Sequence, residues 1–211
     1  MSMNTLRPMR IESEKTRREE YSEATRAALL DAAKRLFTAN GYQATGIEAV
    51  AQASRVTRGA LYHHFTDKRA LFDALVVELQ TEAAAAVASR VGNVNDRWAA
   101  MRAGTEAFLD VCTEPAYLRL VIQEAPAVLG LARCREIDEA HTRGLLILAL
   151  KDMQKSGDID FADIGLLSSM IAAAECQAAL LMPDAKDRAA LKAAALDALD
   201  RIVGAFRPKR R

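Results

Sequence analysis

Apolar residues recur at helical spacing along most of the chain, interrupted by only a few helix-breaking positions. The first strongly periodic segment is 22–41, with Ser22 in the place of an N-cap and Gly41 in that of a C-terminal stop. Glycine and proline divide the rest into helices of ordinary length, which we predict at 67–90, 95–113, 116–124, 134–156, 162–182 and 186–206. The predicted fold class is therefore all-α, in keeping with the abundance of Ala, Leu, Arg and Glu.

Residues 45–68 carry two very short apolar stripes separated by a tight turn. The stripes consist of Ile47, Val50 and Ala51, then of Ala60, Leu61 and Phe65. A helix-turn-helix needs such a division into an apolar and a polar face, because its second helix packs on one side and reads the major groove with the other. The outward residues of the second helix are Thr57, as N-cap, followed by Arg58, Tyr62 and His63.

A larger set of informative residues extends from the motif into the segments on both sides of it. The set consists of Ala32-Ala33, Leu36-Phe37, Gly41-Tyr42, Ala44-Thr45, Val50-Ala51, Val56, the run Leu61 to Phe65, Lys68 and Leu71-Phe72. Over residues 22 to about 72, this set resembles the DNA-binding domain of the tetracycline-repressor (TetR) family of bacterial transcription regulators. The resemblance implies an N-terminal three-helix helix-turn-helix domain at 22–68, joined to a C-terminal helical domain at 69–206 for ligand binding and dimerisation.

The resemblance also implies roles for single residues. Tyr62 and His63 resemble phosphate and base contacts, and Arg58 occupies an outward position suited to base reading. Lys68, at the start of the next helix, resembles a lysine that grips a backbone phosphate. Thr45 resembles the threonine near the start of the first short helix. The predicted DNA-binding residues are Thr45, Gly46, Thr57, Arg58, Tyr62, His63 and Lys68.

Two positions depart from the family pattern. Gly46 stands where a second threonine usually caps the helix and touches phosphate, so either Thr45 takes over that role or one contact is missing. Arg55 stands where the turn usually has glycine, and a positive φ costs most other residues about 1 kcal/mol or more. The turn is therefore either strained or built differently.

Structural alternatives exist for several of these residues. Tyr62 could be a half-buried core tyrosine, and Lys68 an ordinary solvated lysine. The adjacent His63 and His64 could suggest a metal site, but neighbouring helical residues do not face each other and no third ligand lies near in the sequence. We predict no metal and no cofactor.

The distribution of charge supports a nucleic-acid partner at the N-terminal end. Residues 1–70 hold 12 Lys and Arg against 8 Asp and Glu, whereas residues 71–211 hold 17 against 20. Residues 1–21 are polar and lack periodicity, which predicts a flexible arm whose Lys15, Arg17 and Arg18 either reach an adjacent groove or form a solvated cluster. The basic segment 207–211 is predicted to be a frayed tail.

Cysteine usage and hydropathy point to the cytoplasm. Cys112, Cys134 and Cys176 are odd in number and lie in apolar surroundings typical of reduced core residues, and the N-terminus lacks an apolar signal segment. The apolar run from Ile164 to Met182 contains Glu175 and further polar residues, so we predict a buried helix and no membrane partner.

The last two long helices are apolar on more than one face, which predicts a homodimer closed by a four-helix bundle, as the resemblance also implies. The chosen interface residues are Ile171, Ala174, Ala178, Leu196, Leu199 and Ile202. A second stripe on the first of these helices consists of Leu166, Met170, Ala173 and Leu180. The alternative is that one subunit covers both faces itself.

The middle helices are implied by the resemblance to enclose a ligand chamber. The predicted lining residues are Trp98, Met101, Phe108, Tyr117, His141, Leu145 and Glu175, although each apolar one could be plain core. Glu175 must be exposed, paired or in a cavity, because burying a lone carboxylate costs several kcal/mol. Its candidate partners are Arg119, Arg133 and Arg143.

Taken as a regulator, the chain is expected to be a repressor that binds a near-palindromic double-stranded DNA operator as a dimer and is released by a small apolar or aromatic effector. An enzyme is disfavoured because nucleophile-elbow, Walker, dinucleotide and Cys-x-x-Cys motifs are missing, and the i, i+3 pair Asp138 and His141 has no second such pair. The remaining alternative is a ligand-independent architectural DNA binder.

Overall fold

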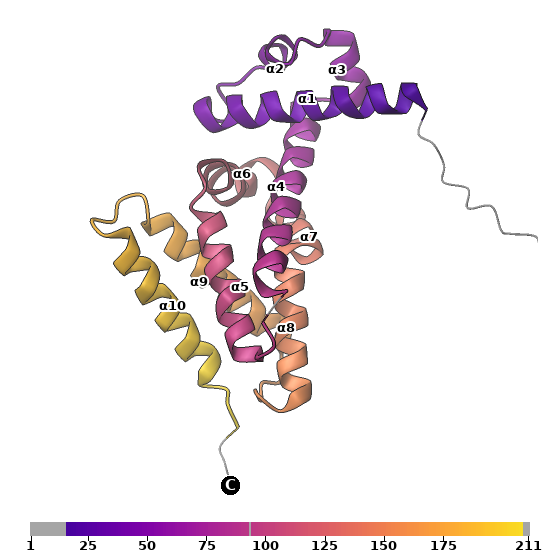
Figure 1. Ribbon diagram of the computed structural model, residues 1–211. Helices are drawn as coiled ribbons and strands as arrows, with labels where there is room; N and C mark the ends of the chain where they lie inside the picture. Colours follow the sequence, from indigo (N-terminus) through magenta and orange to yellow (C-terminus); the bar gives the residue numbers. More distant parts are fainter. Residues whose placement is uncertain (1–15, 93, 209–211) are drawn as a thin grey trace, which may run out of the picture.

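A computed structural model describes residues 16–92 and 94–208, and these residues form helices without any strand. The all-α prediction is confirmed. The helices are α1 (Arg17–Asn40), α2 (Ile47–Ala53), α3 (Arg58–His64), α4 (Lys68–Val91), α5 (Arg97–Cys112), the π-helix η1 (Tyr117–Glu124), α6 (Ala125–Leu129), α7 (Leu131–Ala140), α8 (Thr142–Ser156), α9 (Ile164–Leu181) and α10 (Arg188–Gly204). Helices α1 to α3 sit at one end of an elongated bundle formed by the others (Figure 1).

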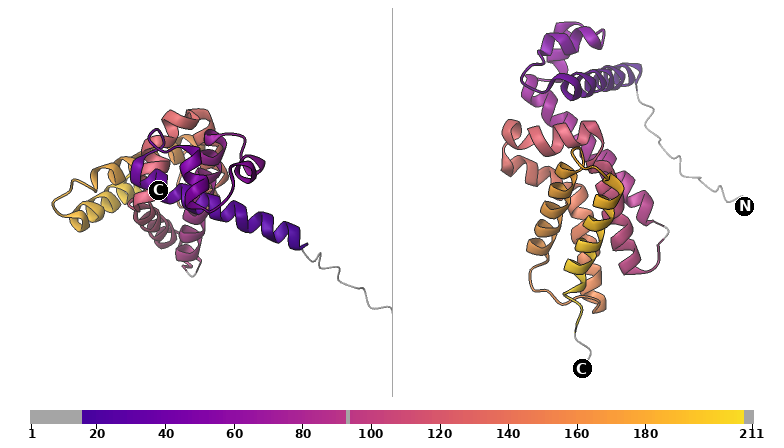
Figure 2. Two further views of the ribbon diagram at one scale, coloured as in Figure 1. Left: turned by 90° about the horizontal axis from the view of Figure 1, so that it is seen from above. Right: turned by 90° about the vertical axis from the view of Figure 1, so that its left-hand side faces the viewer.

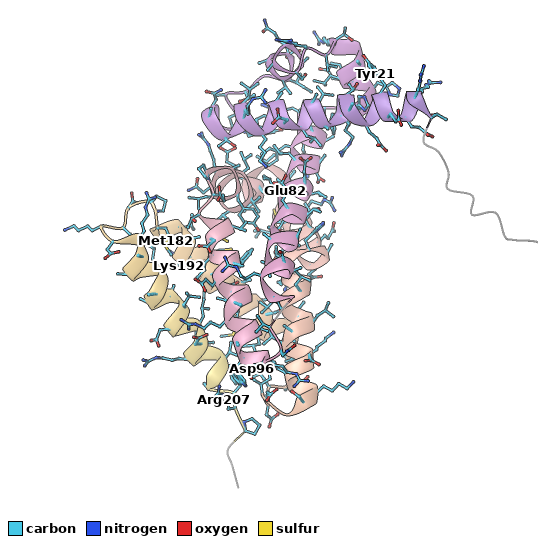
Figure 3. All side chains as sticks on the ribbon, in the orientation of Figure 1. Tyr21, Glu82, Asp96, Met182, Lys192 and Arg207 are labelled. Atoms are coloured by element: carbon cyan, nitrogen blue, oxygen red, sulfur yellow. The ribbon has the colours of Figure 1, made fainter. Side chains whose placement is uncertain are left out.

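Helix α1 begins before the position that the apolar pattern predicts. Thr16 is its N-cap and forms a capping box with Glu19, so Ser22 lies inside the helix and residues 17–21 are helical. The prediction of a flexible arm over 1–21 is wrong for these five residues, and its remainder, with Lys15, lies outside the described residues. The first turns project past the core, and Tyr21 is 78% exposed on them (Figure 3).

Aromatic rings fix the N-terminal block onto the start of α4. Phe37, Tyr42 and Phe72 pack with ring centroids 5.0 to 5.7 Å apart, and Phe37 and Phe72 are fully buried. Gly41 ends α1 with φ +85° and passes the chain to α2, as the glycine stop predicts. On the other side of α1, the Arg26 guanidinium lies 5.4 Å from the Phe65 ring.

Helix α4 joins the two parts of the molecule without a break. Its N-cap Asp67 accepts a hydrogen bond from the Ala70 amide at 2.7 Å, and the helix then runs through the block and down the length of the C-terminal part (Figure 1). One continuous hydrophobic cluster holds residues of α1 to α3 together with α4, α5 and η1. The two parts of the molecule are therefore joined by both a continuous helix and a shared core.

The middle of the chain is more irregular than its periodicity predicts. The expected helix 116–124 is a π-helix, and Pro126 starts α6 instead of marking a break. The expected helix 134–156 is two helices that meet at His141, whose φ and ψ are −126° and −108°. The carbonyl of Glu139 approaches Gly144 so closely at this junction that a Cβ there would lie 2.4 Å from it. A continuous helix would be inconsistent with that approach.

Helices α9 and α10 lie side by side at one outer face (Figure 2). Their inner sides pack against α5 and α8 in a second hydrophobic cluster that includes Leu109, Leu150 and Leu167. Within the part of the chain that is described, Ile164–Leu181 is the one helix long and apolar enough to cross a membrane by length and composition. This helix packs against α5, α8, α10 and η1, as a helix of a bundle does.

Candidate DNA-binding surface and ligand cavity

The outward residues of α3 form one exposed surface. Thr57 accepts a hydrogen bond from the Ala60 amide at 3.2 Å, which confirms the predicted N-cap. Tyr62 is 40% exposed, so it is not a core residue, and the Arg58 guanidinium lies 5.5 Å from its ring. Arg58 also approaches Glu48 of α2 at 3.4 Å, an exposed ion pair worth little on its own. These side chains are therefore free to exchange their contacts for a polyanion.

The start of α2 lacks a side-chain cap. Gly46 is the N-cap and offers none, while Thr45 is buried and its hydroxyl donates to the Gly41 carbonyl at 2.8 Å. Thr45 therefore does not take over the role of the missing threonine. One cap contact of the family pattern is absent from this chain.

Lys68 braces the loop that leads into α2. Its ammonium donates to the carbonyls of Tyr42 at 2.9 Å and Thr45 at 3.1 Å, and it lies 4.2 Å from the Tyr42 ring centroid. The alternative of an ordinary solvated lysine is wrong. An ammonium has three N–H donors, so one remains for a phosphate.

The turn between α2 and α3 takes the left-handed conformation despite its arginine. Arg55 has φ +57°, a left-handed conformation that glycine adopts without strain, and its side chain is exposed. The turn is closed by hydrogen bonds from the Arg55 amide to Gln52 at 3.1 Å and from the Val56 amide to Ala51 at 3.0 Å. The turn therefore has the shape of the family's glycine turn and carries strain.

Side chains of η1 hold the C-terminal end of α1. Arg119 donates to the carbonyls of Thr38 at 2.8 Å and Ala39 at 3.1 Å and pairs with Glu124 at 3.1 Å. Glu124 in turn accepts a hydrogen bond from the Tyr42 amide at 2.8 Å. Gly41 makes room for this arrangement, because a Cβ there would lie 2.8 Å from Arg119. Sequence reasoning missed this junction, since nothing local links residues about 80 positions apart.

Two further contacts tie the first turns of α4 to the C-terminal part. Arg69 donates to the carbonyls of Val128 at 3.2 Å and Leu129 at 3.0 Å, at the end of α6. Arg133 of α7 forms a bidentate pair with Asp73 at 2.8 and 2.9 Å. The guanidinium of Arg133 holds the pKa of the Asp73 carboxyl below its usual range.

A cavity of about 530 Å³ lies at the other end of α4, among α4, α5, α7, α8 and α9. This volume suits a small organic ligand. Of the predicted lining residues, Met101, Phe108, Leu145 and Glu175 line it. Further lining residues come from α4, α5 and α8, namely Val87, Ala88, Val91, Ala100, Gly104, Thr105, Thr142, Arg143, Leu146, Ala149 and Met153.

Three predicted lining residues lie elsewhere. Trp98 of α5 is not among the residues that line the cavity, which on this helix are Arg97, Ala100, Met101, Gly104, Thr105 and Phe108. The Arg207 guanidinium lies 3.9 Å from the centroid of the Trp98 ring instead. Arg207, predicted to belong to a frayed tail, is thus packed at the end of the bundle farthest from α1 (Figure 3). Tyr117 is buried in the first core edge-on to Phe108, and His141 occupies the junction of α7 and α8, its Nδ1 2.7 Å from the Ile137 carbonyl oxygen.

Glu175 is buried in the cavity wall, and no cationic side chain of the described residues pairs with it. Burial raises the pKa of its carboxyl to about 8, and a hydrogen bond with Thr105 opposes this only in part. None of the predicted partners pairs with it, because each arginine is occupied elsewhere. Arg119 caps α1, Arg133 binds Asp73, and Arg143 contacts Asp138, Glu139 and Ser169.

A polar cluster connects the cavity wall to α4. Thr142 lies 2.8 Å from Gln80 of α4 and 3.0 Å from Asp138, and burial raises the pKa of Asp138. Arg143 is buried too, and its Nε has no hydrogen-bond partner among residues 16–92 and 94–208, although Asp138 lies 3.4 Å away. The cavity thus combines apolar walls with polar groups that are incompletely satisfied.

The predicted dimer residues lie mostly inside the subunit. Ile171, Leu196 and Leu199 are at most 5% exposed because they face the second core, while Ala174 and Ala178 are partly buried and Ile202 is 38% exposed. The choice is wrong for Ile171, Leu196 and Leu199, whereas Ile202 does lie on an exposed face. The stripe exposed on α9 is the second one, with Leu166, Met170, Ala173 and Leu180, joined by Leu181. Beside it, α10 exposes Ala190, Ala194, Ala198 and Ile202.

Comparison with known proteins identifies both parts of the chain. Residues 29–75 match the family model of bacterial regulatory proteins of the tetR family, and residues 98–206 match that of the tetracyclin repressor-like C-terminal domain. The HTH-type transcriptional repressor Rv1474c of Mycobacterium tuberculosis is 47% identical over 74 residues, which cover 35% of this chain and 39% of that protein. The Tn10 TetC protein of Escherichia coli is 24% identical over 74% of this chain and 79% of its own.

Solved structures extend the likeness over nearly the whole chain. A TetR-family transcriptional regulator from Pectobacterium atrosepticum is 29% identical with a TM-score of 0.72 and covers 93% of this chain and 100% of its own. The structure of RolR in complex with resorcinol shares the fold, with 16% identity, a TM-score of 0.66 and coverage of 90% and 98%. The chain belongs to the TetR family of DNA-binding transcription regulators.

Proposed function

We propose that this protein is a one-component repressor that binds a near-palindromic operator as a homodimer in the cytoplasm and is released by a small apolar or aromatic ligand. The observation that carries the proposal is the single helix α4, which has the helix-turn-helix at one end and the cavity at the other. We place the DNA-binding domain at 17–68 and the ligand-binding and dimerisation domain at 69–206.

The proposed DNA-binding surface centres on α3. Arg58, Tyr62 and His63 read bases and phosphates, while Lys68 adds its remaining N–H to a phosphate. Thr57 positions α3 as its cap. The backbone amides at Gly46 serve in place of the absent threonine hydroxyl, and the exposed first turn of α1 brings Arg17 and Arg18 alongside.

The proposed dimer interface is the exposed face of α9 and α10. Large apolar side chains such as Leu166 and Met170 are costly to leave in water, and the alanines of α10 permit close approach of a second copy. Ala173→Arg is expected to give folded monomers that lose binding to a full operator, whereas Leu199→Arg, in the core, unfolds the chain. Folded dimers of Ala173→Arg in analytical ultracentrifugation would contradict this interface.

Coupling between ligand and DNA is proposed to run through α4. A ligand in the cavity contacts its last turns at Val87 and Val91, while Gln80 contacts the polar cluster through Thr142. The start of α4 and the end of α1 are held by Arg69 and Arg119. A shift of α4 against these contacts would change the spacing of the two recognition helices, which must match successive major grooves.

The proposal is supported by the protein's relatives. RolR was solved with resorcinol, a small aromatic molecule, and the cavity of this chain has space for such a compound. An architectural DNA binder would have no use for the cavity. The family consists of transcription regulators, which also argues against an enzyme.

Fluorescence anisotropy with DNA from the flanking intergenic regions tests the proposal. Arg58→Ala is expected to weaken specific binding by about 1–3 kcal/mol, and Arg90→Ala, which removes the same charge from the last turn of α4, to change it little. Equal effects of the two variants would contradict the surface. If compounds that bind and stabilise the protein never release it from DNA, the architectural alternative would be favoured.

A further inference from the structure

The unusual group in the cavity is the carboxyl of Glu175. It lies midway along α9, is 4% exposed, and its hydrogen bond with Thr105 of α5 is the one polar contact found for it in the described part of the chain. No lysine or arginine of residues 16–92 or 94–208 pairs with it. An acidic group buried in this way lowers stability unless something neutralises it.

The charged neighbour that acts on Glu175 is Asp138 of α7, a second acid. The thiols of Cys112 on α5 and Cys176 on α9 also lie nearby, and because burial raises the pKa of each thiol, neither supplies a charge. The two arginines of the cavity wall are already engaged by carboxylates: Arg143 by Asp138 and Glu139, and Arg97 by Asp152 and Asp158. The part of α4 that faces the cavity offers only Val87, Ala88, Val91 and Gly92. The two guanidinium groups thus already face four carboxylates, and Glu175 has no share in either.

We propose that the cavity binds amphipathic cations, in which one protonated amine pairs with Glu175 and an apolar or aromatic body fills the space between α4 and α5. The proposal rests on the proposed function of the cavity as the effector site. The body would contact Val87, Met101 and Phe108, while the hydroxyl of Thr105 orients the carboxylate. Anionic ligands are disfavoured, because both arginines of the described cavity wall already face carboxylates, and the Nε–H of Arg143, which has no hydrogen bond, lies 3.4 Å from Asp138.

Charge pairing at a buried acid makes affinity depend on pH. Burial holds the pKa of Glu175 near 8 in the free protein, so its proton must leave when an ammonium binds below that pH. Affinity for a cation is therefore expected to rise about tenfold per pH unit up to about pH 8 and then to level off. A neutral ligand of the same shape has no such linkage.

Three matched probes test the proposal with the full-length dimer: 4-phenylbutylamine, 4-phenyl-1-butanol and 4-phenylbutyrate. The amine stays protonated throughout, like a lysine side chain with a pKa of about 10.4. In calorimetry, it should bind about 50-fold more tightly at pH 8 than at pH 6 and release about one proton at pH 7. The alcohol should change less than twofold over this range, and the carboxylate should bind weakest.

Substitution of the acid gives the second part of the test. Glu175→Gln should lower the affinity for the amine to that for the alcohol and abolish proton release. The affinity for the alcohol should stay unchanged. Glu114→Gln, which removes an exposed carboxyl after α5, should behave like the parent. If Glu175→Gln does not fold, the proton release of the parent decides the question.

Several outcomes would overturn the proposal: equal affinities for amine and alcohol at every pH, preference for the carboxylate, or no binding of the amine. The proposed function is tested by a separate measurement, that of operator binding. It is supported if the alcohol or the carboxylate binds and weakens operator binding, and it is contradicted if ligands that occupy the cavity leave operator binding unchanged.

Discussion

The N-terminal block and the C-terminal domain use their interiors in opposite ways. In the block, the rings of Phe37, Tyr42 and Phe72 fill the centre in direct contact, while Lys68 satisfies carbonyls of the loop before α2 and Arg119 those at the end of α1. The C-terminal domain encloses a cavity of about 530 Å³ and buries Glu175 without a counter-ion among the described residues. A surface that must match DNA benefits from rigid packing, whereas a binding site needs space and groups that a ligand can satisfy. Stability and function are thus distributed unevenly along one chain.

The largest expected effect contrasts two phenylalanines. Phe72→Ala should lower the free energy of unfolding by about 3–5 kcal/mol, because it leaves a hole in a close-packed core. Phe108→Ala should cost less, about 1–2 kcal/mol, because this ring already borders empty space and the transfer of its buried face is the main loss. Urea unfolding at one fixed protein concentration measures both. Equal losses would break the comparison between the two interiors.

The next effect contrasts two carboxyls by pH. Burial raises the pKa of Glu175 in the folded protein from 4.5 to about 8. Its carboxyl therefore has little effect on the free energy of unfolding at acid pH and lowers it as the pH rises from 4.5 to about 8. Glu175→Gln should therefore stabilise the ligand-free protein by up to about 3 kcal/mol at pH 7 and by nearly nothing at pH 4.5.

Asp73 serves as the opposite case. Its pKa is lowered by Arg133, so the stability that it contributes is present above its unfolded pKa and lost as pH falls through the folded value. Asp73→Asn should destabilise the protein at pH 7 and have less effect in acid. Parallel pH profiles for the two variants would show that the assignment of the two environments is wrong.

A smaller effect is expected where the two regions meet. Arg119→Ala removes the donors to Thr38 and Ala39 and should cost about 1–2 kcal/mol in unfolding free energy. It should also reduce the ratio of operator affinities measured without and with ligand, since α1 would no longer follow η1. Arg135→Ala, an exposed arginine on α7, is the matched control. An unchanged ratio would remove Arg119 from the coupling route.

The smallest effect concerns the strained turn in the otherwise rigid block. Arg55→Gly should relieve the positive φ and stabilise the protein by about 1 kcal/mol, whereas Arg55→Ala removes the charge and keeps the strain. Thermal unfolding separates the two contributions. Destabilisation by glycine would mean that the arginine side chain contributes more than the backbone angle costs.

The block was the more predictable part because its signals are local. The N-cap Thr57 and the helix stop Gly41 follow from residue type and spacing within a few positions. The family resemblance left two alternatives for the turn at Arg55, and the structure has the strained one. The early start of α1 was missed although Thr16 and Glu19 have the spacing of a capping box, because the apolar stripe begins only farther along.

The C-terminal domain was less predictable because its choices depend on tertiary contacts. Both stripes of α9 are apolar, and periodicity alone cannot say which one faces the core, so Ile171 was assigned to the wrong surface, and so was Leu199 of α10. The sequence left Glu175 exposed, paired or in a cavity, and it did not show that Arg133 and Arg143 are engaged elsewhere. The break at His141 depends on the approach of Glu139 to Gly144, a contact that the pattern of the sequence does not show.

The position of Gly41 has a consequence for genetics. Any side chain there would meet both an unfavourable backbone angle and the guanidinium of Arg119, which belongs to the other domain. If the proposed ligand control holds, a screen for variants whose target genes no longer respond to the ligand should recover changes at Gly41, Arg119 and Glu124. Such variants would lie outside both the proposed DNA-binding surface and the cavity, and would alter the contacts that connect the two domains.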